Sequence, residues 1–272
     1  MENKQEISEL LKKEKYYFED LVTVVRLLRG EGGCPWDREQ THKSIRNDLI
    51  EETYEVIEAI DTENPTLLRE ELGDVLLQVV FHARISEEES AFAIDDVTDE
   101  ICRKLIHRHP HVFADVVADT SEEVLKNWEN IKSDEKSRRT VTDKLRAVPP
   151  MLPALMRATK VGKKASCFDF PEVSDVMDKL SEEFVEVSEA IEEGDAAHIH
   201  EEIGDLLLTV TSLCRKVGVS AEDALRDATD KFIVRFSEIE ESVLAEGKSM
   251  SEVSLAELDE IWCKNKEKQQ KK

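Results

Sequence analysis

Two short acidic motifs in the first half of the chain have residue types and a spacing that suit a metal site. Glu51, Glu52 and Glu55 form an E-E-x-x-E pattern, and Glu71 and Asp74 follow in an E-x-x-D pattern. Carboxylates that converge on one point repel one another unless a cation compensates their charge. Hard oxygen ligands of this kind favour Mg²⁺, or Mn²⁺, over zinc.

The same acidic pattern returns in the second half of the chain, at a constant offset of 131 residues. The repeated acids are Glu182, Glu183, Glu186, Glu201, Glu202 and Asp205. A single E-E-x-x-E pattern on a helix is usually a solvated face. A duplication could also preserve structural acids, but two motifs repeated in order and at identical spacing favour a binding site.

Each half also carries a Lys–Arg pair and a Trp–Lys pair, both spaced by one helical turn. They are Lys104, Arg108, Trp128 and Lys132 in the first half, and Lys231, Arg235, Trp262 and Lys266 in the second. Cations one turn apart can hold phosphate groups. Alone, the basic pairs would be surface charges and the tryptophans core anchors. The neighbouring lysines make the tryptophans candidates for a lid over a base or phosphate.

Helices must position these residues. Pro and Gly are scarce, at 7 and 9 residues, while hydrophobic and charged residues make up 40% and 36% of the chain. This balance favours long amphipathic helices and an all-α fold. Around Glu51–Ile60, helical spacing places Glu51 and Glu55 on one face and Ile60 on the opposite one. We expect this helix to pack antiparallel against a second one, over Glu70–Phe81, through a turn at Asp61–Thr66.

The repeat predicts two homologous helical-bundle domains. We place the first at residues 1–134, a linker at 135–150 and the second at 151–272, since Pro149 and Pro150 follow a polar segment between the halves.

Charge and cysteine usage limit the partners. The formal net charge of −24 argues against nucleic acid binding through a basic surface. The five cysteines are scattered without a C-x-x-C pair, as in a reduced cytosolic protein. The N-terminus is polar and every apolar stretch is short, so we expect a cytoplasmic protein without a membrane partner. A phosphate-binding loop and a G-x-S-x-G motif are both missing from the sequence.

On these motifs, the chain resembles the tandem-domain MazG family of all-α nucleoside triphosphate pyrophosphohydrolases. The similarity spans roughly residues 18–268. Its most specific segments are Gly33–Asp37, Leu49–Ile60, Glu70–Phe81, Arg108–Phe113 and Leu152–Leu155. The sequence departs from the family at His198–His200, where a lysine is often found.

The resemblance implies a homodimeric, Mg²⁺-dependent enzyme that converts nucleoside triphosphates to monophosphate and pyrophosphate. It implies that the C-terminal domain is the main catalytic unit. Its metal would be held by Glu182, Glu183, Glu186, Glu202 and Asp205, with Glu201 beside them. Lys231 and Arg235 would hold phosphates, Trp262 and Lys266 would approach the nucleotide, and Lys132 would reach it from the linker side.

The N-terminal domain keeps every motif acid, together with Lys104 and Arg108, so it is a candidate for a second site. An alternative from another class stays open at this stage. The chain could be a nucleotide-binding regulatory or scaffold protein with little turnover.

Overall fold

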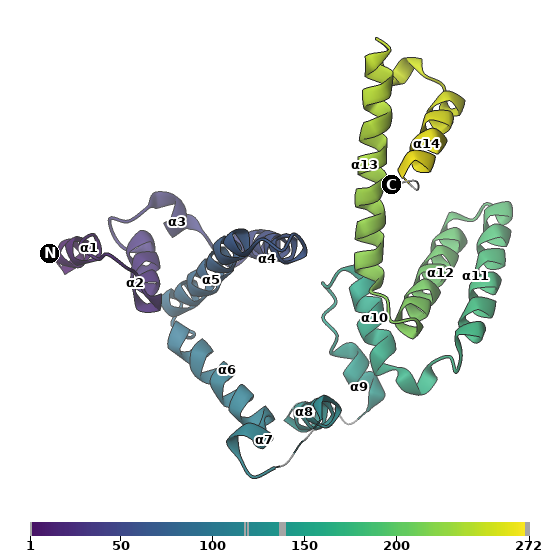
Figure 1. Cartoon of the computed structure of the whole chain (residues 1–272). Helices are drawn as coiled ribbons and strands as arrows, with labels where there is room; N and C mark the ends of the chain where they lie inside the picture. The colour runs from purple at the N-terminus through teal and green to yellow at the C-terminus, as the bar shows by residue number, and fades with distance from the viewer. Residues whose placement is uncertain (1, 117, 119, 136–139, 270–272) are drawn as a thin grey trace. The chain divides into compact units, whose positions relative to one another are not determined.

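The computed structural model of the chain is helical, as the composition predicts (Figure 1). It describes residues 2–116, 118, 120–135 and 140–269, although not the side chains of 2, 3, 126, 129, 130, 133–135 and 266–269. These described residues contain helices and no strand. The helices are α1 (Glu2–Leu10), α2 (Phe18–Arg29), α3 (Pro35–Glu39), α4 (Arg46–Asp61), α5 (Pro65–Glu88), α6 (Ile94–Arg108), α7 (Pro110–Phe113), α8 (Ser121–Glu135), α9 (Val141–Arg146), α10 (Ala154–Lys164), the 3₁₀ helix η1 (Ser166–Phe168), α11 (Val173–Glu193), α12 (Ala196–Lys216), α13 (Ala221–Ala245), the 3₁₀ helix η2 (Met250–Glu252) and α14 (Leu255–Gln269).

The chain divides into two compact units, Met1–Lys132 and Ser133–Lys272, so the boundary falls within α8. The segment 135–150, which we propose as the linker, contains the short helix α9, and α9 packs against α10 of the second unit. Among the described residues, no helix combines the length and apolarity needed to cross a membrane.

An α-hairpin of α4 and α5 forms the centre of the first unit, and the predicted turn between them is confirmed. Asn64 begins α5: its side-chain oxygen accepts hydrogen bonds from the backbone N–H groups of Thr66 and Leu67, and Pro65 occupies the first helical position. The Asn64 oxygen satisfies two N–H groups that a helix start leaves free, and Pro65 has no N–H that would need a partner. Glu63, just before the cap, has a left-handed backbone with φ of 50°.

The α11–α12 hairpin repeats this arrangement in the second unit. Gly194 ends α11 with φ of 73°, and the side chain of Asp195 accepts a hydrogen bond from the N–H of Ala197 at the start of α12. Gly194 and Asp195 lie 131 residues after Glu63 and Asn64. The repeat therefore extends from the acidic motifs to the backbone of the turn.

The hydrophobic core of the first unit lies where α2 and the residue before α4 meet α5. Val25, Ile45, Val80, Phe81 and Ile85 are its buried members. Arg29 links α3 and the residue after it to this core, because its guanidinium donates hydrogen bonds to the carbonyl oxygens of Asp37 and Gln40.

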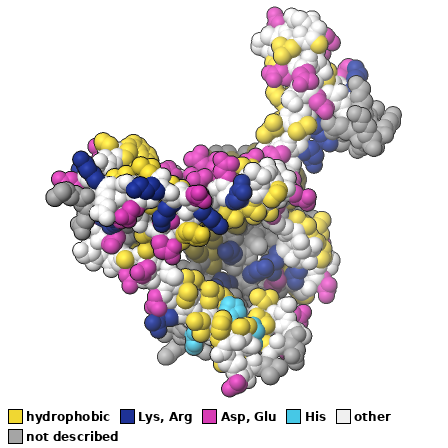
Figure 2. All heavy atoms as spheres, turned by 60° about the vertical axis from the view of Figure 1, so that its left-hand side comes forward, with side chains coloured by type: hydrophobic (Ala, Val, Ile, Leu, Met, Phe, Trp, Pro, Cys, Tyr) yellow, Lys and Arg dark blue, Asp and Glu magenta, His cyan; other side chains and the backbone are white. Residues whose placement is uncertain are grey.

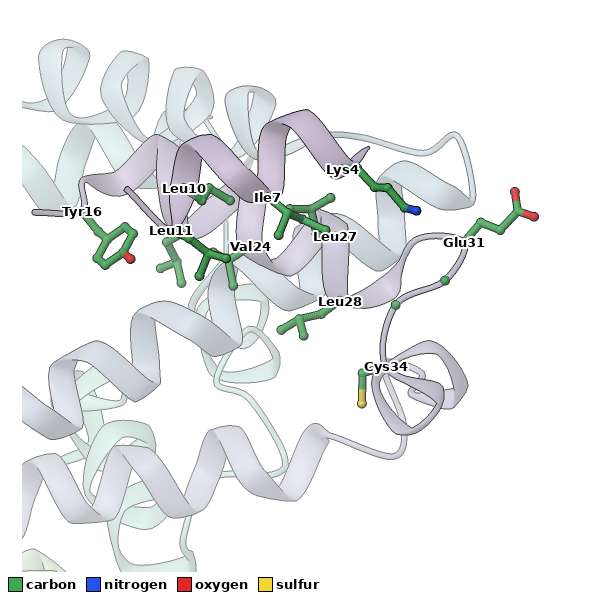
Figure 3. A pocket seen from close by; sticks show the side chains of 13 residues that line it. Lys4, Ile7, Leu10, Leu11, Tyr16, Val24, Leu27, Leu28, Glu31 and Cys34 are labelled. Carbon is green, nitrogen blue, oxygen red and sulfur yellow. The ribbon is translucent and has the colours of Figure 1, made fainter. Parts of the chain in front are cut away.

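The apolar faces of both hairpins are only partly covered. Ile60, on the helix face opposite Glu51 and Glu55, is 55% exposed, and Phe184 on α11 is 66% exposed. Figure 2 shows hydrophobic side chains at the surface beside acidic ones. An apolar groove of about 950 Å³ also lies between α1 and α2, lined by Ile7, Leu11 and Leu28 (Figure 3). The candidate site acids do not line this groove.

Candidate active site

The α11–α12 hairpin brings three of the predicted acids together. Carboxylate oxygens of Glu183, Glu186 and Glu202 lie within 4.8 Å of one another, and we call these residues the C-terminal cluster. Glu183 and Glu186 share one face of α11, and Glu202 comes from the neighbouring turn of α12. Converging carboxylates on two packed helices can surround a divalent cation.

Glu183 is the most deeply buried member of the C-terminal cluster, with 4% of its surface exposed. Its Oε2 atom is buried and has no hydrogen-bond partner among the described residues. A buried carboxylate oxygen without a partner carries a large desolvation penalty. A cation in the C-terminal cluster would satisfy this oxygen, so the residues fit a hard divalent metal such as Mg²⁺.

Lysine 179, which the sequence motifs did not single out, lies against the C-terminal cluster. Lys179 Nζ is 2.6 Å from Oε1 of Glu182, 3.0 Å from Oε1 of Glu183 and 3.7 Å from Oε2 of Glu186. The hydrogen bonds to Glu182 and then Glu183 raise the pKa of this lysine above its usual value. The i, i+4 spacing of Lys179 and Glu183 is a signal that the sequence already contains.

His198 lies in the stretch where the sequence departs from the family pattern, and it contacts an acid of the C-terminal cluster. Its Nε2 is 3.1 Å from Oε1 of Glu202, and its Nδ1 is 2.9 Å from Oε2 of Glu193. The hydrogen bond with Glu193 is the main cause of a raised pKa for this imidazole. The structure therefore gives His198 a second acidic partner outside the predicted motifs.

The α4–α5 hairpin forms the matching N-terminal cluster from Glu52, Glu55 and Glu71, whose oxygens also lie within 4.8 Å of one another. Glu71 is 8% exposed. Burial, followed by a hydrogen bond with Glu55 and the charge of Asp74, raises the pKa of Glu52 to about 7. Burial and the charge of Glu55 likewise raise the pKa of Glu71. These shifts indicate crowded carboxylates, which a cation would relieve.

The remaining motif acids lie outside the two clusters. Asp74 is partly buried and close enough to influence Glu52, whereas the other acids are exposed. The exposed ones are Glu51, Glu182, Glu201 and Asp205. The structure thus separates converging acids, which are buried or partly buried, from exposed acids at the edge of each cluster.

Each half also pairs its predicted arginine with its predicted tryptophan. The guanidinium carbon of Arg108 lies 5.3 Å from the centre of the Trp128 ring, and that of Arg235 lies 5.6 Å from the centre of the Trp262 ring. These are cation–π distances. The repeated order of these residues therefore corresponds to a repeated contact.

The other basic candidates have less defined surroundings. Lys231 is exposed on α13, Lys132 is partly buried on α8, and Lys104 lies 3.4 Å from Oε1 of Glu100. The side chain of Lys266 lies outside the described residues.

Two segments of the chain match one known protein family. A model of the MazG nucleotide pyrophosphohydrolase domain matches residues 40–113 and again residues 161–239. The chain belongs to the MazG nucleotide pyrophosphohydrolase family. The resemblance seen in the motifs is thereby confirmed, as is the tandem arrangement of MazG domains.

Curated MazG relatives match the chain over most of its length. It is 44% identical over 251 residues to the nucleoside triphosphate pyrophosphohydrolase/pyrophosphatase MazG of Thermotoga maritima, covering 92% of this chain and 95% of that protein. It is 44% identical over 247 residues to the nucleoside triphosphate pyrophosphohydrolase of Escherichia coli strain K12, covering 89% of this chain and 94% of that protein. A Mycobacterium tuberculosis protein of the same name is 44% identical over 148 residues, covering 54% of this chain and 45% of that protein.

The two MazG matches contain both acidic clusters and both Lys–Arg pairs. Trp128, Lys132, Trp262 and Lys266 lie beyond the matched ranges. Membership of the MazG family therefore rests on the hairpins and the helix that follows each of them, while the tryptophans depend on the structural contact.

Proposed function

We propose that this chain hydrolyses nucleoside triphosphates to nucleoside monophosphate and pyrophosphate, with Mg²⁺ at the C-terminal cluster. The relatives named as nucleoside triphosphate pyrophosphohydrolases support the reaction. The buried, unpartnered Oε2 of Glu183 is the observation that best supports the metal position. The enzyme is a hydrolase that acts on acid anhydrides.

The C-terminal cluster would hold the metal through Glu183, Glu186 and Glu202, with the exposed acids Glu182, Glu201 and Asp205 at its edge. Mg²⁺ held there would supply positive charge to phosphate oxygens and would ease the ionisation of a water. Mn²⁺ can take the same oxygen ligands. Hydrolysis adds the elements of water across the anhydride bond between the α and β phosphates.

Basic and aromatic residues of the second unit complete the proposed nucleotide site. Lys231 and Arg235 bind the phosphates and offset their charge. Trp262 covers the nucleotide with a ring already oriented by Arg235 and by Phe232, whose ring centre lies 5.6 Å away. Lys266 and Lys132 approach the same nucleotide.

The N-terminal cluster is proposed as a second metal and nucleotide site, with Lys104 and Arg108 as its phosphate ligands. Its three carboxylates, like those of the C-terminal cluster, have oxygens within 4.8 Å of one another. The contact of Arg108 with the Trp128 ring is the counterpart of the contact of Arg235 with the Trp262 ring.

We further propose that the enzyme is a cytoplasmic homodimer. The partly covered hairpins support dimerisation: Phe184, Val185, Ile191, Leu207 and Leu208 are between 47% and 66% exposed. Exposed apolar residues on paired helices are characteristic of a surface that a partner covers. Sedimentation of the purified protein would measure the mass, and a monomer at all concentrations would contradict the dimer.

Release of pyrophosphate by the full-length chain tests the reaction. A panel of ribo- and deoxyribonucleoside triphosphates is incubated with Mg²⁺ or with EDTA, and pyrophosphate and orthophosphate are measured separately. We expect Mg²⁺-dependent release of pyrophosphate, lost in Glu183→Gln and retained in Glu189→Gln, which changes an exposed acid on the same helix. Nucleotide binding without turnover would instead favour a regulatory or scaffold protein.

A further inference from the structure

The two acidic clusters have the same carboxylates but different neighbours. Lys179 lies against the C-terminal cluster, and the position 131 residues earlier is Asp48. His198 contacts the C-terminal cluster, and its counterpart is Leu67. Both differences add positive charge, or the capacity for it, to the C-terminal cluster alone.

The helix fixes Lys179 close to the metal ligands. Counted from Lys179 as position i, the acids Glu182, Glu183 and Glu186 stand at i+3, i+4 and i+7. All three therefore lie on the same face of α11 as the lysine. The ammonium is 3.0 Å from Oε1 of Glu183, the acid whose other oxygen is buried without a partner. Lys179 thus already supplies part of the positive charge that a divalent metal would bring.

The N-terminal cluster has no such internal cation. Glu52, Glu55 and Glu71 take part in none of the ion pairs found among the described residues. Asp48, one turn before Glu52 on α4, adds a further carboxylate to the same stretch of helix. Within the described part of the chain, a divalent cation entering this cluster therefore meets carboxylates that no lysine, arginine or histidine neutralises through an ion pair.

We propose that Lys179 is a built-in counter-ion that makes divalent-metal binding at the C-terminal cluster depend on the nucleotide, whereas the N-terminal cluster binds the metal alone. An ammonium and a divalent cation repel each other when they share the same carboxylates. A triphosphate brings enough negative charge to accommodate both. Glu182, whose side chain is 59% exposed, can retain the lysine at the edge when the metal enters. This inference rests on the proposed function for its ligands.

The affinity of the full-length protein for Mn²⁺ tests this role. Free Mn²⁺ is measured by electron paramagnetic resonance at pH 8, with and without a non-hydrolysable triphosphate analogue that has a methylene group between the α and β phosphates. Wild type should show a tight and a weak class of sites without the analogue, and the analogue should tighten the weak class. Loss of the weak class in Glu186→Gln would assign it to the C-terminal cluster.

Three variants test whether the positive charge of Lys179 causes the difference in metal affinity. Lys179→Gln should tighten the weak class on the order of tenfold or more and reduce its dependence on the analogue, in the usual range of coupling between two ligands. Lys179→Arg keeps the charge and should behave as wild type. The matched variant Asp48→Lys should weaken the tight class.

The inference is overturned if Lys179→Gln, with a wild-type circular dichroism spectrum, binds Mn²⁺ as wild type does. If that variant fails to fold, Asp48→Lys decides, and an unchanged tight class would contradict the proposal. The failure of the proposed reaction can be told apart from the failure of this inference. Absence of pyrophosphate release would contradict the reaction and leave the Mn²⁺ result unaffected. Pyrophosphate release together with unchanged Mn²⁺ affinities in Lys179→Gln would contradict only the role of Lys179.

Discussion

Glu63 and Gly194 occupy the same place in the two α-hairpins, and both have a left-handed backbone, with φ of 50° and 73°. Each residue stands directly before the side chain that caps the next helix. Only glycine adopts this conformation without a steric penalty from a Cβ atom. The turn is therefore relaxed in the second unit and strained in the first.

Substitutions at this turn should change stability in opposite directions. Gly194→Ala should lower the free energy of unfolding of the second unit by about 1 kcal/mol, and Glu63→Gly should raise that of the first by up to about 1 kcal/mol. Urea denaturation followed by circular dichroism measures both. Gly204→Ala is the control, since open space surrounds this helical glycine and alanine should stabilise it. Equal effects of the two alanine variants would contradict this account.

The ion pair between Asp169 and Arg215 should make the second unit sensitive to acid. Hydrogen bonds from Arg215, which tie α12 to the segment before α11, lower the pKa of Asp169 to about 2. A lowered pKa contributes stability above the ordinary value near 4, and this stability is lost as the pH falls from about 4 to about 2. Allowing for solvent screening, the contribution is about 1–2 kcal/mol.

Unfolding of Asp169→Asn between pH 2 and pH 7 would measure this contribution. The variant should be less stable than wild type at pH 7, and the difference should shrink toward pH 2. A stability difference that stays constant over this range would mean that the carboxylate charge is not responsible.

Glu183→Gln should abolish most of the activity while keeping the fold. The amide has nearly the shape of the carboxylate but lacks the charge that a divalent metal requires. We expect kcat/KM to fall at least about 100-fold, which corresponds to about 2.7 kcal/mol of transition-state stabilisation. Glu189→Gln, an exposed acid on the same helix, is the control and should retain wild-type activity.

Replacing the two tryptophans should reveal which half binds the substrate during turnover. If the C-terminal unit is catalytic, Trp262→Ala should raise KM several-fold, because it removes a ring held by Arg235. Trp128→Ala should leave KM close to wild type. A larger increase of KM in Trp128→Ala than in Trp262→Ala would show that the active site lies in the first unit. Steady-state pyrophosphate release over a range of substrate concentrations provides the measurement.

The fold was largely predictable because its signals are local and occur twice. The helices around Glu51–Ile60 and Glu70–Phe81, and the turn between them, follow from periodicity and from Asn64 and Pro65. For tryptophan and arginine, the sequence showed only that the two residues recur in the same order in both halves. The contact between their rings and guanidinium groups required the structure.

The composition of each cluster was less predictable, because it depends on how the helices are rotated. Helical spacing alone placed Glu51 with Glu55, whereas packing against α5 brings Glu52 to Glu55 and leaves Glu51 exposed. Lys179 was visible at i, i+4 from Glu183. Most such pairs are solvated surface contacts, and only the burial of Glu183 distinguishes this one.

The arginine–tryptophan contacts also give each half of the molecule its own optical reporter. Trp128 and Trp262 hold equivalent positions in the two units, each beneath a guanidinium, and the third tryptophan of the chain, Trp36, is 61% exposed. Indole fluorescence responds to a nearby charge. Two variants of the full chain would use this property, each with Trp36 replaced by phenylalanine and either Trp128 or Trp262 replaced as well. The fluorescence of the single tryptophan left in each variant would then report nucleotide binding in its own half, without an attached dye.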